Sequence, residues 1–346
     1  MVADKTLYEL LSDYFRVYLP HFKKRSEHTI RSYRSALNSL LDFVKTENGV
    51  KLAQVTLDMI DSGMVAKYLA HLDEKDNSLT TRNLRLNCIK AFYSYASEAG
   101  AEAVAFAAEI LKIPKATVPK HRKVDYISED AVSTLLNQPD TRTPKGRRDR
   151  FFMLLMYDTG ARLAEIRGLK LKSIVWTKKV QVTLYGKGNK ERPVPITDMV
   201  AAELKTYLEE FHPDADKYGD DFLFYIASRN SRNQFSDSIA RKIVRGYGDA
   251  AKEVCPEIPD IMHPHMLRHS RAMHLYQKGN ELALIQQWLG HANQETTLVY
   301  AYADTEHKRK AIEASIDKNS PLAKRRNAER YTLSDDETVK KLYGLV

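Results

Sequence analysis

The first third of the chain carries apolar residues at the spacing of amphipathic helices. Two stretches have an apolar period of about 3.6 residues, the first built from Leu7, Leu10, Leu11, Tyr14, Phe15 and Tyr18, the second from Ile30, Tyr33, Leu37, Leu41 and Val44 after a capping Ser26. Two more helices are expected over 57–72 and 79–99, the latter capped by Ser78. Residues 1–113 are therefore predicted to form a small helical domain.

A basic stretch containing prolines interrupts this helical pattern. Pro114 and Pro119 break the helix, and Lys120, Arg122 and Lys123 concentrate positive charge beside them. We place a linker at 114–126 and expect these three basic residues to contact a polyanion.

From residue 127 onward the spacing is again mostly helical, with one exception. Residues 180–196 alternate in polarity around Gly186 and Gly188, a pattern typical of a β-hairpin. The second domain, 127–320, is therefore expected to be mixed and mostly helical with a small antiparallel β-sheet, and the fold class as a whole is mainly α. Residues 321–346 turn polar and form a C-terminal tail.

The charge balance narrows the classes of partner. The chain has 346 residues, with 54 Lys and Arg against 45 Asp and Glu, a formal net charge of +9. This excess lies on both sides of the linker, so a polyanion is expected to contact both domains. Apolar residues make up 43% and charged residues 29%, which excludes wholesale disorder.

Membrane and disulfide classes are disfavoured. The longest apolar run, 151–157, is far shorter than the ~20 residues that cross a bilayer. The first residues lack the features of a signal peptide, so we expect a cytoplasmic protein without membrane partners. Only Cys88 and Cys255 are present, too few for a zinc ribbon or a disulfide framework.

Residues 158–169 read as a turn followed by a short helix. Gly160 precedes a helix that opens near Arg162, and Glu165 follows three residues later. Free backbone N–H groups at a helix start favour an anion, so Arg162 is a candidate anion ligand and Glu165 could orient its guanidinium.

Residues 185–195 predict a hairpin whose tip presents Lys187 between Gly186 and Gly188. A mobile lysine can deliver a proton or a positive charge to a phosphate. The segment lacks the GxxxxGK[ST] pattern of a P-loop, so ATP binding is not supported.

Residues 263–270 hold the densest cluster of histidines. Pro264 suits the first turn of a helix that carries His265, Arg268 and His269. His265 and His269 have a metal-ligand spacing, but the Glu of HExxH and a nearby cysteine are missing. A phosphate-facing His/Arg pair and a structural role for His269 are favoured over zinc, and Arg162 with Arg268 could hold one phosphate.

Residues 289–302 follow an amphipathic helix expected over 282–288. His291 comes directly after Gly290 at the end of that helix, and Thr296 and Thr297 precede Tyr300 in what should be another short helix. Tyr302 lies two residues beyond, and a tyrosine in such a segment, taken alone, is usually part of the core packing.

These four segments together resemble the tyrosine recombinase, or phage integrase, family. The matching boxes are TGxRxxE at 159–165, GKGxKxR at 186–192, PHxLRH at 264–269, and LGH followed nine residues later by tyrosine. The helices of 1–113 are similar to the family's SAM-like core-binding domain. The resemblance implies a catalytic set around the nucleophile Tyr300, formed by Arg162, Lys187, His265, Arg268 and His291.

The resemblance also implies a mechanism and partners. Tyr300 would form a 3′-phosphotyrosyl link to DNA, with His265 as its proton acceptor and Lys187 as the acid for the leaving oxygen, and no cofactor or metal would be required. The partner would be double-stranded DNA with specific core sites, which Lys120, Arg122 and Lys123 would also contact. The free protein would be a monomer or weak dimer, and it would form a homotetramer at synapsis. The tail at 321–346 could dock on a neighbouring protomer, and accessory DNA-bending or directionality proteins could take part.

Three other functions remain open at this point. A type IB topoisomerase shares the phosphotyrosyl chemistry but relaxes DNA without exchanging partners. A catalytically silent DNA-binding architectural protein would need no reactive tyrosine. A zinc hydrolase would use His263, His265 and His269. Within the resembled family, the extended tail favours a mobile-element (transposition) integrase slightly over a Xer-type resolvase or a phage enzyme.

Overall fold

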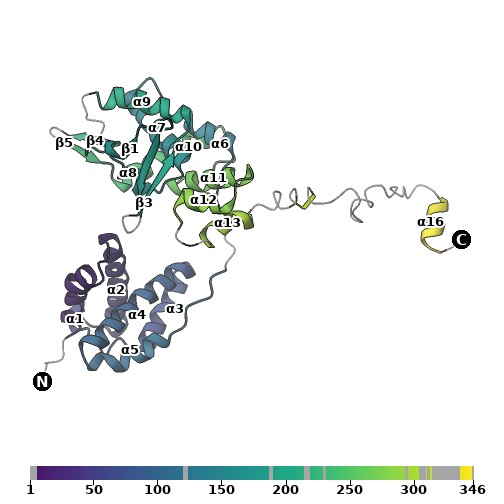
Figure 1. Cartoon of the computed structure of the whole chain (residues 1–346). Helices are drawn as coiled ribbons and strands as arrows, with labels where there is room; N and C mark the ends of the chain where they lie inside the picture. Colours follow the sequence, from purple (N-terminus) through teal and green to yellow (C-terminus); the bar gives the residue numbers. More distant parts are fainter. Residues whose placement is uncertain are drawn as a thin grey trace. The chain divides into compact units, whose positions relative to one another are not determined.

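The computed structural model divides the chain into two compact units, Met1–Lys120 and His121–Val346 (Figure 1). It describes residues 6–119, 124–186, 190–213, 219–228, 231–291, 293, 295–303, 309, 312–313 and 336–344. Helices dominate both units and the strands form small antiparallel sheets, so the predicted fold class is confirmed. None of the described helices combines the length and the apolar character needed to span a bilayer.

The first unit is entirely helical in its described part. Its elements are α1 (Leu7–Asp13), the π-helix η1 (Tyr14–Phe22), α2 (Glu27–Asn48), the 3-10 helix η2 (Leu52–Gln54), α3 (Ser62–Glu74), α4 (Leu79–Ala99) and α5 (Glu102–Lys112). Ser26 and Ser78 cap α2 and α4 as expected, each accepting the backbone N–H three residues on. The apolar stripes of these helices meet in one core.

One predicted helix start in this unit is wrong. The sequence indicates a helix from residue 57, but α3 begins at Ser62, because the Asp61 side chain caps it by accepting the Met64 N–H at 2.7 Å. Leu57 and Ile60 are nevertheless buried, from a turn that precedes the helix. These two residues are apolar because they pack in the core. An apolar spacing alone does not show whether such residues belong to a helix or to a buried turn.

The second unit surrounds a buried central helix, α7. Nearly all of the second half of α7 is inaccessible, including the run from Phe151 to Met156. The elements are α6 (Glu129–Leu136), α7 (Pro144–Thr159), α8 (Leu163–Arg167), η3 (Leu171–Ser173), β1 (Ile174–Val175), β2 (Gln181–Tyr185), β3 (Glu191–Pro195), α9 (Asp198–Phe211), β4 (Tyr225–Ser228), β5 (Ser231–Gln234), α10 (Asp237–Lys252), α11 (Pro264–Gln277), α12 (Leu282–Leu289), α13 (Glu295–Ala303) and α16 (Asp336–Leu342).

The predicted hairpin over 180–196 is confirmed. Strands β2 and β3 pair antiparallel with Val182 opposite Val194 and Leu184 opposite Arg192, and β1 adds a third strand. Paired residues share a face of the sheet, so Arg192 lies on the side that buries Leu184. The second hairpin, β4–β5, was not expected, because its residues 225–234 lack a clear apolar alternation.

A small apolar cluster, separate from the main core, holds α13. Tyr300 is buried there among Val124, Met273, Ile285 and Leu289, at the junction of α11, α12 and α13. These three helices lie together in the green part of Figure 1. The cluster therefore fixes the position of the segment that carries the candidate nucleophile.

Candidate active site

The start of α8 fixes the first arginine of the site. Arg162 is the N-cap residue, and Glu165 returns to it in two ways: Oε2 accepts the Arg162 backbone N–H at 2.7 Å, and Oε1 accepts a guanidinium N–H at 3.0 Å. A glutamate three residues into a helix is placed to make this contact. The orienting role expected for Glu165 is thus seen in the structure.

A second arginine, Arg192 from β3, binds the same carboxylate. Its two terminal nitrogens donate to Oε1 and Oε2 of Glu165, both at 2.8 Å, in a bidentate pair. Glu165 has only 3% of its side chain exposed. Burial raises the pKa of this carboxyl, but the hydrogen bonds from Arg192 and Arg162 outweigh burial and hold the pKa below its usual value.

The C-terminus of α12 binds three arginines through consecutive carbonyls. The carbonyl oxygen of Trp288 accepts from Arg192 at 3.0 Å, that of Leu289 from Arg268 at 2.7 Å, and that of Gly290 from Arg162 at 3.2 Å; the three arginines come from β3, α11 and the start of α8. The last carbonyls of a helix lack intrahelical partners and carry partial negative charge, which suits cations. The end of α12 therefore gathers the site's positive charge.

Gly290 makes this arrangement possible. Its φ of +64° turns the chain, with its own N–H bonded to the Gln287 carbonyl and the His291 N–H to the Gln286 carbonyl, a Schellman ending. A Cβ at this position would lie 2.8 Å from a terminal nitrogen of Arg192. Glycine is required both by the backbone conformation and by the approach of the guanidinium.

Arg268 is held at the bottom of the site. It is 3% exposed and also donates to the Gly160 carbonyl at 2.6 Å. Burial lowers the pKa of Arg268 to about 9, and the neighbouring charge of Arg162 adds to the effect. Arg162 and Arg192 share the carboxylate of Glu165, whereas Arg268 is bound only by carbonyl oxygens. Three guanidinium groups therefore lie near a single carboxylate, and the site keeps an excess of positive charge that favours an anion.

Tyr300 lies beside this charge with its side chain fully buried. Its hydroxyl is 2.9 Å from Nδ1 of His269, and the two rings are 5.9 Å apart between centroids. Burial raises the pKa of Tyr300 to about 12, against the lowering effect of Arg268. Tyr302, by contrast, is 61% exposed.

Two more histidines lie in the same electrostatic field. Nδ1 of His291 is 2.9 Å from the hydroxyl of the buried Thr297 on α13. Burial, followed by the charge of Arg268, lowers the pKa of His265 and brings that of His291 to about 3. Both imidazoles are neutral at physiological pH and available for hydrogen bonds to an anion.

Comparison with known protein families decides the identity of this fold and site. Residues 125–307 match the phage integrase family, and residues 13–100 match the phage integrase N-terminal SAM-like domain. The chain belongs to the phage integrase family of tyrosine recombinases. The family resemblance predicted from the four sequence boxes is thereby confirmed.

Curated tyrosine recombinases align with this family member over most of their length. The chain is 30% identical to tyrosine recombinase XerA of Pyrococcus furiosus over 90% of this chain and 96% of that protein. It is 31% identical to tyrosine recombinase XerD of Staphylococcus epidermidis over 83% of this chain and 92% of that one.

Solved tyrosine recombinases share the fold. The XerH site-specific recombinase, in a pre-cleavage complex with its difH substrate, aligns with a TM-score of 0.63 at 21% identity, covering 87% of this chain and 84% of XerH. The Tn1549 transposon integrase bound to transposon right end DNA aligns with a TM-score of 0.62 at 17% identity, covering 90% of this chain and 99% of that one.

The structure brings most of the predicted catalytic residues of this recombinase into one site. Arg162, His265, Arg268, His291 and Tyr300 are the predicted members it describes there, linked by the contacts and charge effects above. Lys187 lies outside the described residues, as do Lys120, Arg122 and Lys123. Among the residues that are described, no group of three or more His, Cys, Asp or Glu side chains is arranged to hold a metal ion.

Three residues of the site were not predicted from the sequence. Arg192 is the last residue of the GKGxKxR box. Its pairing opposite the apolar Leu184 across the hairpin was the signal that its side chain lies on the buried face of the sheet. The sequence favoured a structural role for His269, whereas the structure places its Nδ1 within hydrogen-bond distance of the Tyr300 hydroxyl. Thr297, which contacts His291, follows a segment whose turn geometry the sequence does not specify.

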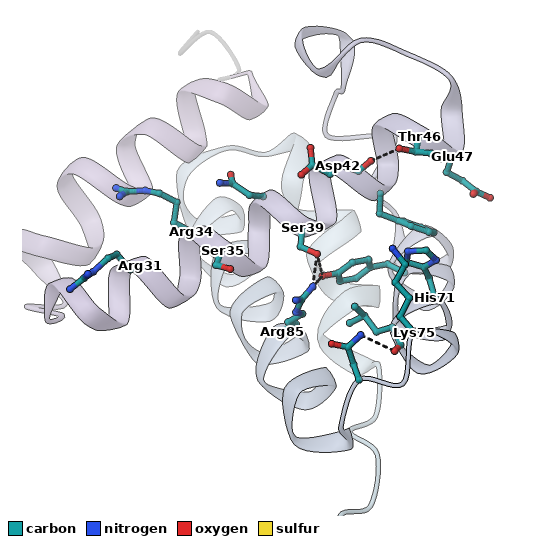
Figure 2. Close-up of a pocket in the computed structure, with 15 residues that line it drawn as sticks. Arg31, Arg34, Ser35, Ser39, Asp42, Thr46, Glu47, His71, Lys75 and Arg85 are labelled. Atoms are coloured by element: carbon teal, nitrogen blue, oxygen red, sulfur yellow. Dashed lines mark hydrogen bonds between the residues drawn. The ribbon is translucent and has the colours of Figure 1, made fainter. Parts of the chain in front are cut away.

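A second candidate surface lies on the first unit, between α2, α3 and α4 (Figure 2). This groove has a volume of about 820 Å³. Arg31 and Arg34 line the groove from the N-terminal half of α2, and Arg85 of α4 reaches toward Ser39 near the middle of that helix, as Figure 2 shows. Arg85 donates to the hydroxyls of Tyr68, at 2.8 Å, and Ser39.

The charge of Arg85 is not neutralised by these contacts. The Tyr68 hydroxyl donates in turn to Ser39 at 2.9 Å, so two neutral groups fix the guanidinium. Within the described part of the chain, no carboxylate forms an ion pair with Arg85. Asp42 and Glu47 line the C-terminal half of α2 instead, which leaves the end with Arg31 and Arg34 positive.

Proposed function

We propose that this tyrosine recombinase cleaves and rejoins double-stranded DNA at specific sites through a 3′-phosphotyrosyl link to Tyr300. The observation that carries this proposal is the convergence of Arg162, Arg192 and Arg268 on the end of α12, beside the Tyr300 hydroxyl. A phosphodiester resists attack because it is anionic and its leaving alkoxide is poor. An excess of fixed positive charge beside a nucleophile answers the first difficulty.

The residues would act in a balanced sequence. Tyr300 Oη attacks phosphorus as its proton passes to a neighbouring histidine, an O–P bond forms, and the bond from phosphorus to the 5′ oxygen breaks. Arg162 and Arg268 stabilise the negative charge on the non-bridging oxygens, and His265 and His291 add hydrogen bonds. Lys187 gives its proton to the departing 5′ oxygen. A 5′ hydroxyl of another strand then attacks the phosphotyrosine and releases Tyr300, so that the bond energy is retained without ATP.

Both units are proposed to contact the DNA. In the first unit, Arg85 with Arg31 and Arg34 offers positive charge that hydroxyls orient without neutralising it. In the second unit, the site described above holds the scissile phosphate. The basic linker residues Lys120, Arg122 and Lys123 would add backbone contacts, so binding would weaken steeply with salt. The DNA-bound relatives with the same fold, XerH and the Tn1549 integrase, support this choice of partner.

The assembly is proposed from the chemistry of strand exchange. Sequential exchange of two strand pairs between two duplexes requires four protomers, of which only part are active at once. A lambda integrase of the same fold has been solved as a tetramer on a Holliday junction. We propose a free monomer or weak dimer that tetramerises on two core sites, with the tail at 321–346 docking on a neighbouring protomer. The enzyme would act in the cytoplasm, with accessory proteins setting its direction.

The test of this function is a plasmid assay that separates recombination from relaxation. A preferred site is selected from random DNA by binding, and two copies are placed in direct repeat on a supercoiled plasmid. The proposed recombinase yields two smaller circles, and a plasmid with one copy yields none. Relaxed topoisomers from both plasmids would indicate the topoisomerase alternative, and binding without new products would indicate an architectural protein.

A further inference from the structure

Within the part of the chain that the structure describes, the Tyr300 hydroxyl forms its hydrogen bond with the imidazole of His269. The distance from Tyr300 Oη to His269 Nδ1 is 2.9 Å. His265, which was expected to accept the proton of Tyr300, has its ring centroid 6.4 Å from that of His269 on the same face of α11. The histidine next to the reactive oxygen is thus the one four residues further along the helix.

We propose that His269 is the general base that removes the proton of Tyr300 during DNA cleavage, an inference that rests on the proposed function. The neutral ring carries its proton on Nε2 and accepts the Tyr300 O–H at Nδ1. As the O–P bond forms, the proton passes from Oη to Nδ1 and leaves an imidazolium. In the rejoining step Nδ1 returns the proton to Oη as the bond between phosphorus and Tyr300 breaks.

The surroundings of His269 suit a base. Burial is the largest of the effects that together lower the pKa of His269 to about 4. The neighbouring His265, Arg268 and His263 act in the same direction, and the carboxylate of Asp125 acts in the opposite direction. Among the described residues, Tyr300 from α13 and His291, which follows α12, are further titratable groups near the ring. At neutral pH His269 is therefore unprotonated and free to accept a proton.

The packing around Tyr300 and His269 holds the two side chains in contact. Tyr300 is fully buried in the apolar cluster with Val124, Met273, Ile285 and Leu289, and His269 lies on the helix that contributes Met273 to it. The reactive oxygen and its proton acceptor are thus aligned before DNA arrives, which removes part of the ordering cost of the reaction.

The experiment measures single-turnover cleavage of a nicked suicide duplex, in which the released fragment diffuses away, for wild type, His269→Asn and His269→Ala. Asn places an amide oxygen near the position of Nδ1, so it accepts the Tyr300 hydrogen bond but takes no proton at neutral pH. A base at His269 predicts that both variants lose about 100-fold or more in the cleavage rate constant. Binding of the uncleaved duplex should stay within about twofold, which controls for folding.

The pH profile separates a base from a structural contact. The wild-type rate constant should be level through neutral pH and fall on acidification as His269 becomes protonated. In His269→Asn the rate constant should rise about tenfold per pH unit, because hydroxide must then ionise Tyr300, whose pKa is raised to about 12.

Three results would overturn this assignment. A His269→Asn protein with the wild-type rate and pH profile would show that the contact only positions Tyr300. A His269→Ala protein with a cleavage rate constant above that of wild type would show that His269 only restrains Tyr300. A wild-type protein that binds its site but never forms the adduct would overturn the proposed function itself, and this assignment with it.

Discussion

The two units of this recombinase hold arginines in different ways. In the second unit, Arg162 and Arg192 share the buried Glu165 and cap the end of α12, so each guanidinium is fixed by a charge and by carbonyls. In the first unit, Arg85 is fixed by the hydroxyls of Ser39 and Tyr68. A carboxylate orients strongly and neutralises part of the charge, whereas hydroxyls orient and leave the charge for a ligand.

The difference suits the two tasks proposed for these units. Chemistry at one phosphate needs donors held in a fixed geometry, and the small site can give up part of its charge because three arginines converge there. Binding along a DNA backbone needs undiminished charge at the surface more than it needs fixed geometry.

Glu165→Gln should have the largest effect on stability. The substitution removes the buried carboxylate shared by the mostly buried Arg192 and the partly exposed Arg162, which should cost about 3–5 kcal/mol of unfolding free energy. Urea denaturation measures this cost. Asp198→Asn, which breaks the exposed pair with Lys179, is the matched control and should leave the midpoint unchanged. Equal midpoints for the two variants would contradict the structural role of Glu165.

Gly290→Ala should damage the site, and Gly279→Ala should not. Both glycines have positive φ, +64° and +85°, so both variants bear a backbone cost of about 1–2 kcal/mol. Only at Gly290 does the new Cβ meet the Arg192 guanidinium, since nothing lies within 4 Å of a Cβ at Gly279. Suicide-substrate cleavage should fall about tenfold or more in Gly290→Ala relative to Gly279→Ala. Equal rates would mean that the contact with Arg192 is unimportant.

Much of this organisation was predictable from the sequence. The helical first unit, the caps at Ser26 and Ser78, the hairpin of β2 and β3, and the four boxes follow from local spacing and from residue type. The convergence of Arg162, Arg192 and Arg268 on α12 does not, because it joins three segments distant in sequence through backbone carbonyls, which carry no residue signature. The His269 contact was missed for the same kind of reason, since it depends on how α13 docks on α11.

Arg85→Gln should weaken DNA binding in a way that depends on salt. Loss of one phosphate contact should reduce the slope of log affinity against log salt by about 0.9. Arg82→Gln is the matched control on the same helix, because Arg82 pairs with Asp73 at 3.1 Å and should be less available to DNA. Affinity measured by fluorescence anisotropy over a salt series tests both variants. Identical slopes for Arg85→Gln and wild type would remove Arg85 from the DNA surface.

Thr297→Val should have the smallest effect of the four. It removes the hydroxyl 2.9 Å from His291 Nδ1 while keeping the side-chain shape, at a cost of about 1 kcal/mol in transition-state stabilisation. Single-turnover cleavage should slow about fivefold. The exposed neighbour provides the control, and Thr296→Val should cleave at the wild-type rate. Equal rates in the two valine variants would show that Thr297 does not orient His291.

The most direct test of the central claim is the chemical link between Tyr300 and DNA. Wild type, Tyr300→Phe and Tyr302→Phe are incubated with a nicked suicide duplex carrying the selected site, in EDTA and without ATP, and covalent adducts are resolved on a denaturing gel. We predict an adduct for wild type and for Tyr302→Phe, and none for Tyr300→Phe. An adduct that persists in Tyr300→Phe and disappears in Tyr302→Phe would contradict the assignment of the buried tyrosine as the nucleophile.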